Sequence, residues 1–405
     1  MGDMTQTHDV VIVGGGLVGA SLAIALDRVG LDVGLVEASA GGTLPPAFDQ
    51  RNLSFAAASV QALSALGVMA RLGQPAGPIR RIHVSRAGDF GCVQLDATDY
   101  GRDSFGQVVV ARDFGEALES KLQEARHLTR YRPARFIGTG PVHEGLRPVR
   151  VACEAGERLL HARLLVGADG TRSAVRELLH IGTQEHDFLQ TLFVARVRAR
   201  RIPDGTAYER FHDTGPTALL PRGDRHYGAV HGVARQEAEA VAALDEAGWL
   251  ARLQRAAGWR AGQLVASGER SAYPIVQVLA DQLVADRVVL LGNAAQTVHP
   301  LGAQGFNLGL RDALTLAELI EDDRSDPGAG SLLSDYATRR KSDREQTIAF
   351  SGGLALLTGQ SSALLRPLRS LGLLAAARHS PLQGMLVAGA MGFRGQVPRL
   401  CRSNP

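Results

Sequence analysis

The fold is decided by residues 9–19, which read Asp-Val-Val-Ile-Val-Gly-Gly-Gly-Leu-Val-Gly. The apolar, β-branched run from Asp9 to Val13 predicts a buried strand, and the glycines after it predict a tight turn. The apolar spacing from Leu17 to Val29 predicts a helix that Gly30 ends. A second apolar run, Asp32 to Glu37, predicts the next strand. Strand, glycine turn, helix and strand in this order predict a parallel βαβ unit.

The glycines have the G-x-G-x-x-G spacing of a dinucleotide-binding loop. In this loop Gly14 permits the turn, Gly16 lets the backbone approach a diphosphate, and Gly19 lets the helix pack closely on the strand. The helix N-terminus favours the negative charge of the diphosphate. An acid at the end of the second strand is placed to bind an adenosine ribose. The residues expected at the cofactor are Gly14, Gly16, Leu17, Val18, Gly19 and Glu37.

Two later segments repeat the pattern of an apolar strand that runs into a glycine turn. Arg163 to Val166 leads into Gly167-Ala168-Asp169-Gly170, and Arg287 to Leu291 leads into Gly292-Asn293. We expect all three strands to belong to one sheet, with other material inserted between them. The fold class is therefore α/β: a Rossmann-type domain with an insertion.

The inserted material has a different pattern. Alternating apolar and polar residues between about 190 and 273 predict a mostly antiparallel sheet, with strands at Thr191–Arg198, Ala207–His212 and His226–Gly232. Within it, the alanine-rich stretch from Gln236 to Ala257 is predicted to be helical. Beyond Gly309 we expect mostly helix.

Composition narrows the function. The chain has 405 residues, with 44 basic and 41 acidic ones, so its formal net charge is only +3. A nucleic-acid binder would carry a larger, clustered charge. The three cysteines, Cys92, Cys153 and Cys401, are far apart, so neither a zinc site nor a disulfide framework is expected. The sequence shows no signal-peptide pattern and no run of the roughly 20 apolar residues that cross a bilayer. We therefore expect a cytoplasmic protein.

The third glycine turn favours FAD over NAD as the dinucleotide. A loop of small residues after Gly292 leads into a helix that begins near Gly305 to Asn307. The free N–H groups at such a helix start suit a partly anionic group. The N1–C2=O edge of a reduced isoalloxazine ring is a group of this kind.

Three blocks resemble the FAD-dependent aromatic hydroxylases of the para-hydroxybenzoate hydroxylase class. They are the N-terminal fingerprint with Glu37, the block Asp169-Gly170-x-x-Ser173-x-Val175-Arg176, and the block from Gly292 to Asp312. The last block is most similar to the ubiquinone-biosynthesis branch. Asn293 with Gln296 resembles its 2-polyprenyl-6-methoxyphenol hydroxylases, as does Phe48-Asp49-x-Arg51. One departure is Gly302-Ala303, where the resemblance implies Ala-Gly.

The resemblance implies roles for the matching residues. Arg51 contacts the phosphate and ribose region of FAD, and Arg112 helps to hold the cofactor. Asp169 lies at a turn shared between FAD and NAD(P)H binding, and Asn293 bonds the ribityl chain. The flavin-facing and cofactor-binding positions of the third block are Gly292, Pro300, Gly302, Gln304, Gly305, Phe306 and Asn307. No residue is assigned as a catalyst. His299 beside Pro300 is expected to hold the loop more than to act as a base, and Arg311 with Asp312 is expected to be a structural pair.

The resemblance also implies the chemistry. Reduced FAD forms a C4a-hydroperoxide with dioxygen, and a polyprenylated phenol attacks its distal oxygen. The electron donor is NAD(P)H or a partner reductase. Two alternatives remain open: the same class of enzyme acting at another ring position or on a soluble phenol, and a flavin-binding scaffold subunit of a quinone-biosynthesis complex.

The resemblance and the strand pattern together give domain bounds. The FAD-binding domain spans 1–73, 107–180 and 278–345, the substrate domain spans 74–106 and 181–277, and a C-terminal helical region spans 346–405. The last region has no acidic residue after Glu345 but six arginines: Arg366, Arg369, Arg378, Arg394, Arg399 and Arg402. A basic, apolar stretch suits peripheral contact with the inner face of the cytoplasmic membrane. An ordinary helical cap on the domain is the alternative.

Overall fold

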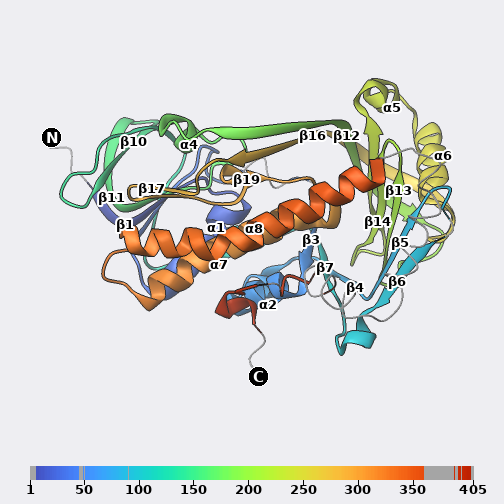
Figure 1. Cartoon of the computed structure of the whole chain (residues 1–405), viewed down its shortest axis with the longest axis horizontal. Helices are drawn as coiled ribbons and strands as arrows, with labels where there is room; N and C mark the ends of the chain where they lie inside the picture. Colours follow the sequence, from blue (N-terminus) through green and yellow to red (C-terminus); the bar gives the residue numbers. More distant parts are fainter. Residues whose placement is uncertain are drawn as a thin grey trace.

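The three apolar runs that end in glycine turns lie in one central sheet, shown on the left of Figure 1. β1 pairs in parallel with β11 on one side and with β2 on the other, and β18 and β8 extend the parallel pairing at both ends. Its eight strands are β1 (Gln6–Val13), β2 (Val33–Val36), β8 (Leu128–Tyr131), β9 (Ala134–Thr139), β10 (Arg147–Cys153), β11 (Gly156–Gly167), β17 (Val284–Ala285) and β18 (Val288–Leu290). Val10, Val11 and Ile12 have no exposed surface, as expected for a parallel sheet covered on both faces.

The computed structural model describes residues 6–44, 49, 51–89, 91–359, 387, 391–393 and 395–402, with the backbone alone for 351–359. Phe48 and four of the six C-terminal arginines lie outside these residues. Long helices cover the central sheet: α1 packs against α3 and α7, and α7 packs against α8. Their bounds are α1 (Leu17–Val29), α3 (Ala111–Leu122), α7 (Gln304–Asp322) and α8 (Gly330–Gly359), and a short α4 spans Ala174–Leu178.

A second eight-stranded sheet lies on the right of Figure 1. Its strands are antiparallel except for β13, which pairs with β5 in parallel. In order across the sheet they are β19 (Gln296–Thr297), β16 (Leu264–Ala280), β12 (Thr183–Ala199), β15 (Tyr227–Ala234), β14 (Gly215–Pro221), β13 (Thr206–His212), β5 (Arg81–Arg86) and β6 (Cys92–Asp96). β12 and β16 have 17 residues each, and these two long strands extend from the second sheet toward the central sheet (Figure 1).

A third sheet has three strands: β3 (Asn52–Ala56), β7 (Gly106–Val110) and β4 (Gly77–Ile79). The helix α2 (Ala57–Ala65) follows β3 directly in the sequence. Short 3-10 turns occur at η1 (Met69–Arg71), η2 (Ala97–Tyr100), η3 (Arg235–Glu237), η4 (Gly292–Ala294), η5 (Leu301–Ala303) and η7 (Arg399–Cys401). The third sheet was not predicted, because its strands are short and lie apart in the sequence.

The helical stretch predicted within the second sheet is confirmed, and it contains one break. The stretch Gln236–Ala257 forms two helices, α5 (Ala238–Ala242) and α6 (Glu246–Ala257). The break occurs because the Asp245 side chain accepts a hydrogen bond from the Gly248 N–H at 2.8 Å and so caps a new helix. α6 then covers the second sheet with Trp249 and Leu253, which are fully buried.

The described part of the C-terminal region packs on the core. Val387 and Met391 lie in a cluster with Phe105 and Val108, and Cys401 has no exposed surface. The Arg399 guanidinium pairs with Glu321 at 2.9 Å and with other acids of α7. These contacts are those of a cap on the fold. In the described part of the chain, no helix combines the length and apolar character that a membrane span requires.

A buried ion-pair network fixes α8 on α7. The Asp343 carboxylate accepts from Arg311 at 2.7 Å and lies 2.8 Å from Arg340, whose Nε donates to Asp312 at 2.7 Å. All four side chains are at most 7% exposed. Arg311 and Asp312 are thus structural, as expected, but each pairs with α8 and not with the other.

We predict that Asp343→Asn lowers the free energy of unfolding by about 3–5 kcal/mol, because it leaves two buried guanidiniums short of a carboxylate. Burial raises the pKa of Asp343, but Arg311 and Arg340 outweigh it and hold that pKa below its ordinary value. The stabilisation is therefore complete at neutral pH and is lost as pH falls through the lowered pKa.

Urea unfolding at neutral pH measures the effect. Asp335→Asn is the matched control, because Asp335 is exposed on the same helix. Equal stability of the two variants would contradict the role of the network.

Candidate functional site

The three glycine turns meet at one edge of the central sheet. Val13 lies opposite Gly167 and Val36, and Gly167 lies opposite Leu290, so these parallel strands end side by side. A Cβ on Gly14 would lie 2.5 Å from the Ala168 carbonyl oxygen, which leaves room only for glycine. The carboxyl edge of a parallel sheet is where such folds bind ligands.

The fingerprint glycines have different surroundings, as the sequence predicts. A Cβ on Gly19 would lie 1.9 Å from the Gly14 carbonyl oxygen, so Gly19 serves close packing of helix on strand. A Cβ on Gly16 would have no protein atom within 4 Å, so its open side faces unfilled space at the start of α1. The first turn of α1 has neither a side-chain cap nor an acidic residue. These features fit the diphosphate of FAD.

Glu37 lies at the same edge and fixes the loop around it. Its carboxylate accepts from the Gly15 N–H at 2.8 Å and from the Ser39 N–H at 2.7 Å. Carboxylate oxygens have lone pairs beyond those used here. The ribose contact of Glu37 stays a prediction that this placement supports.

The third block packs directly on the fingerprint helix. Cβ atoms on Gly292 and Gly309 would lie 2.9 and 2.8 Å from Val18 Cγ2, so α1, η4 and α7 meet through glycine. Asn293 is exposed at this junction, and its ribityl contact stays a prediction. Leu17, at the first turn of α1, packs partly buried against the core.

Arg176 ties the second block to the third, and Asp169 fixes the turn of the second block. The Arg176 guanidinium donates to the Ala294 and Thr171 carbonyl oxygens, both at 2.8 Å, and is 9% exposed. Burial raises the pKa of Asp169 above its ordinary value, against hydrogen bonds from Ser173 and the Val175 N–H. Asp169 Oδ1 is buried and has no hydrogen-bond partner among the residues that the structure describes. The sequence analysis gave a role to Asp169 but none to Arg176. The structure shows that the buried Arg176 guanidinium connects the two blocks through backbone carbonyl groups.

The loop before α7 has left-handed backbone at two successive residues. Gly302 has φ +69° and Ala303 has φ +50°, and Ala303 is the N-cap of α7 without a side-chain cap. The first turn of α7 also has no acidic residue, so its N–H groups suit an anionic acceptor. Pro300 is exposed and Gly305 half-buried beside them, whereas Gln304 is buried and donates to the Gly302 carbonyl at 3.0 Å.

The sequence predicts that the backbone of Phe306 and Asn307 lies at the flavin, and the side chains of both residues contact the protein itself. The Asn307 oxygen accepts from Ala56 N and Ser59 Oγ, and its amide donates to the Ser54 and Ala303 carbonyls, at 2.7–2.9 Å. The Phe306 ring packs 5.1 Å from Phe55. Their side chains join α7 to β3. The contact of their backbone with the flavin stays a prediction.

Arg51 and Arg112 lie next to one another in the backbone, because Ala111 N donates to the Arg51 carbonyl and Arg112 N to that of Asp49. The Arg51 side chain is held by Asp49 at 2.8 Å and stacks on the Tyr273 ring at 4.7 Å. Burial raises the pKa of Asp49, but hydrogen bonds from Arg51 and Tyr273 leave it below its ordinary value. Arg112 is 61% exposed and pairs with Glu116. Their FAD contacts stay predictions.

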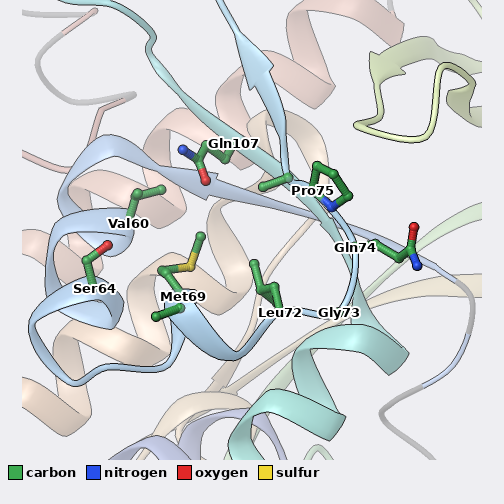
Figure 2. A pocket seen from close by; sticks show the side chains of 10 residues that line it. Val60, Ser64, Met69, Leu72, Gly73, Gln74, Pro75 and Gln107 are labelled. Carbon is green, nitrogen blue, oxygen red and sulfur yellow. The ribbon is translucent and has the colours of Figure 1, made fainter.

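A hollow of about 580 Å³ lies apart from the glycine turns, beside α2 and β7 (Figure 2). Apolar side chains such as Val60, Met69 and Leu72 line it together with Gln74 and Gln107. None of the residues predicted for the cofactor lines it.

We predict that Gly16→Val folds but loses FAD, because the added side chain fills the space at the start of α1 without touching the protein. Gly330→Val is the control, since a Cβ on Gly330 also meets no atom within 4 Å and lies at the exposed start of α8. Flavin absorbance per protein and circular dichroism measure occupancy and fold. Equal FAD occupancy in Gly16→Val and wild type would contradict the assignment of the FAD diphosphate to the start of α1.

We predict that Ala303→Gly raises the free energy of unfolding by about 0.5–1 kcal/mol, because glycine relieves the left-handed backbone. Ala337→Gly, in the middle of α8, should instead lower it by about 1 kcal/mol. Urea unfolding measures the free energy of unfolding of both variants. If both are less stable than wild type, the backbone at Ala303 is not strained.

Comparison with known proteins agrees with this geometry. The family described as FAD binding domain matches residues 7–351. The ubiquinone hydroxylase UbiL of Rhodospirillum rubrum is 33% identical, with 100% of this chain and 95% of that protein covered. The 3-demethoxyubiquinol 3-hydroxylase of Escherichia coli is 30% identical, with 96% and 99% covered.

Solved structures show the same fold. The p-nitrophenol 4-monooxygenase PnpA of Pseudomonas putida matches with a TM-score of 0.79 at 17% identity, covering 97% of this chain and 100% of that one. PqsL of Pseudomonas aeruginosa, titled a probable FAD-dependent monooxygenase, matches with 0.77 at 23% identity, covering 91% and 100%. The chain belongs to the FAD binding domain family and is an FAD-dependent aromatic-ring monooxygenase, similar over its whole length to hydroxylases of ubiquinone biosynthesis.

Proposed function

We propose that the protein hydroxylates the aromatic ring of a polyprenylated phenol, of the 2-polyprenyl-6-methoxyphenol type, in ubiquinone biosynthesis. The observation that carries the proposal is the whole-length similarity to two proteins named as hydroxylases of ubiquinone or its precursor. The reaction then uses FAD and dioxygen through a flavin C4a-hydroperoxide, and the cofactor supplies this chemistry.

The residues of the chain position and shield the reactants. The start of α1 holds the diphosphate of FAD, and Glu37 holds the ribose. The N–H groups at the start of α7 face the carbonyl edge of the flavin ring and stabilise negative charge there. The second sheet lies against this edge through β12 and β16 and can keep water away from the ring. Exclusion of water matters because solvent diverts such reactions to peroxide.

Several parts of the proposal concern partners. The sequence has one dinucleotide fingerprint, which we assign to FAD, so NAD(P)H binds without a domain of its own or a partner reductase supplies the electrons. A polyprenyl tail dissolves in membranes, so we propose peripheral contact with the inner face of the cytoplasmic membrane, within a quinone-biosynthesis complex. The similarity to a 3-demethoxyubiquinol 3-hydroxylase keeps another ring position as the second candidate.

We predict that the FAD-loaded protein, given a reductant and 2-polyprenyl-6-methoxyphenol, consumes dioxygen in step with a product that gains one oxygen atom. Oxygen electrode traces and product mass under ¹⁸O₂ measure this, with Gly16→Val as the flavin-free control. Peroxide without product would mean the wrong substrate, and bound FAD without oxygen uptake would favour the scaffold. The quinone precursor that accumulates on gene deletion identifies the ring position.

A further inference from the structure

His299 is a buried imidazole at the junction of the flavin loop and the second sheet. It directly precedes Pro300 and is 1% exposed. Its ring packs edge-on against Phe188 of β12, with 4.6 Å between centroids. Phe188 reaches it because the pairing of β12 with β16 is interrupted between Asp187 and Thr191, where Leu189 has φ +55°. A local irregularity of the strand thus brings the second sheet onto this histidine.

The hydrogen bonds of His299 fix its tautomer. The Leu301 N–H donates to Nδ1 at 3.1 Å, so Nδ1 is an acceptor and Nε2 carries the hydrogen. Burial lowers the pKa of His299 to about 4, so the ring is neutral at pH 7. With one nitrogen accepting and the other protonated, neither nitrogen is free to take up a proton. The loop-holding role expected from the sequence is therefore present, and a general-base role is disfavoured.

Among the residues that the structure describes, none accepts a hydrogen bond from the Nε2–H group, and this nitrogen is buried. Buried donors are nearly always paired, and leaving one unpaired is costly. An orphan donor beside a ligand-binding loop therefore calls for an acceptor that the ligand brings. Phe188 has only ring carbons to offer, and in the described part of the chain the His186 ring contacts Phe188 without bonding His299.

We propose that His299 Nε2–H donates a hydrogen bond to a ring oxygen of the aromatic substrate bound against the Pro300–Gln304 loop. This inference rests on the proposed function and adds a substrate-binding residue to it. The bond orients the oxygen-bearing side of the ring and favours phenols over rings without oxygen. A flavin carbonyl offers the same acceptor chemistry and is the other possible source, which the first experiment separates.

The first experiment is NMR of the ¹⁵N-histidine-labelled protein, in which His299→Phe assigns the Hε2–Nε2 signal. Spectra are recorded for FAD-free protein, FAD-loaded protein, and FAD-loaded protein with 2-prenyl-6-methoxyphenol. The proposal predicts a downfield Hε2 shift at the last step. A shift at FAD loading that substrate does not change assigns the acceptor to the flavin and overturns the substrate bond. No shift at either step overturns the inference entirely.

The second experiment uses three variants. His299→Phe keeps an aromatic ring but removes the donor, and should weaken binding of 2-prenyl-6-methoxyphenol to the FAD-loaded protein about 10-fold. His299→Gln retains a donor and should recover most of the affinity. Phe188→Leu is the matched packing control and should bind as wild type does.

Wild-type affinity in His299→Phe, or an equal loss in all three variants, would overturn the inference. That failure is distinct from failure of the proposed function, in which the wild-type protein itself does not hydroxylate the phenol. Because the donor is a neutral imidazole, the variant effect should also be constant from about pH 5.5 to 8, whereas a base would show a pH-dependent loss.

Discussion

The close approach of three strand ends is the constraint on which the rest of the structure depends. Backbone meets backbone where Gly14 lies on Ala168 and where Gly19 lies on Gly14, with no room for a Cβ at either glycine. Gly309 likewise lies on the backbone of Gly292, and both glycines lie on the Val18 side chain. Segments more than 100 residues apart in the sequence must meet at this edge, so the chain returns to the central sheet twice. The segments between these returns form the second sheet.

Charge and strain concentrate around this edge. The α8 network reaches it through Asp312, which also accepts from Gln296 at 2.6 Å, while Arg344 binds the other end of Gln296 at 3.1 Å. Buried charged groups therefore fix the segment that leads into the loop before α7, because Gln296 is bonded at both ends. The loop itself has left-handed backbone at Gly302 and Ala303. Such strained backbone persists where the surrounding structure holds it in place.

Periodicity and glycine spacing predicted the parts of the fold that local chemistry determines. The helix from Leu17 to Val29 has the predicted bounds, because a glycine turn and Gly30 punctuate it. The helical stretch from Gln236 to Ala257 was predicted and is confirmed. Its division into α5 and α6 was not predicted, because it depends on a single cap by Asp245. The side-chain roles of Phe306 and Asn307 could not be predicted, since their partners Phe55 and Ser59 lie about 250 residues away in the sequence. His299 was noticed, but its unpaired nitrogen depends on a strand irregularity that no spacing reveals.

The account's central claim is that the three glycine turns form one site, with the diphosphate at α1 and the flavin ring at α7. A crystal structure of the FAD complex tests it most directly, through the distance from the flavin C2 carbonyl oxygen to the N–H groups at the start of α7. The account predicts a distance of about 3 Å, within hydrogen-bond reach. A ring placed more than about 8 Å from this loop, well beyond any hydrogen bond, would contradict it.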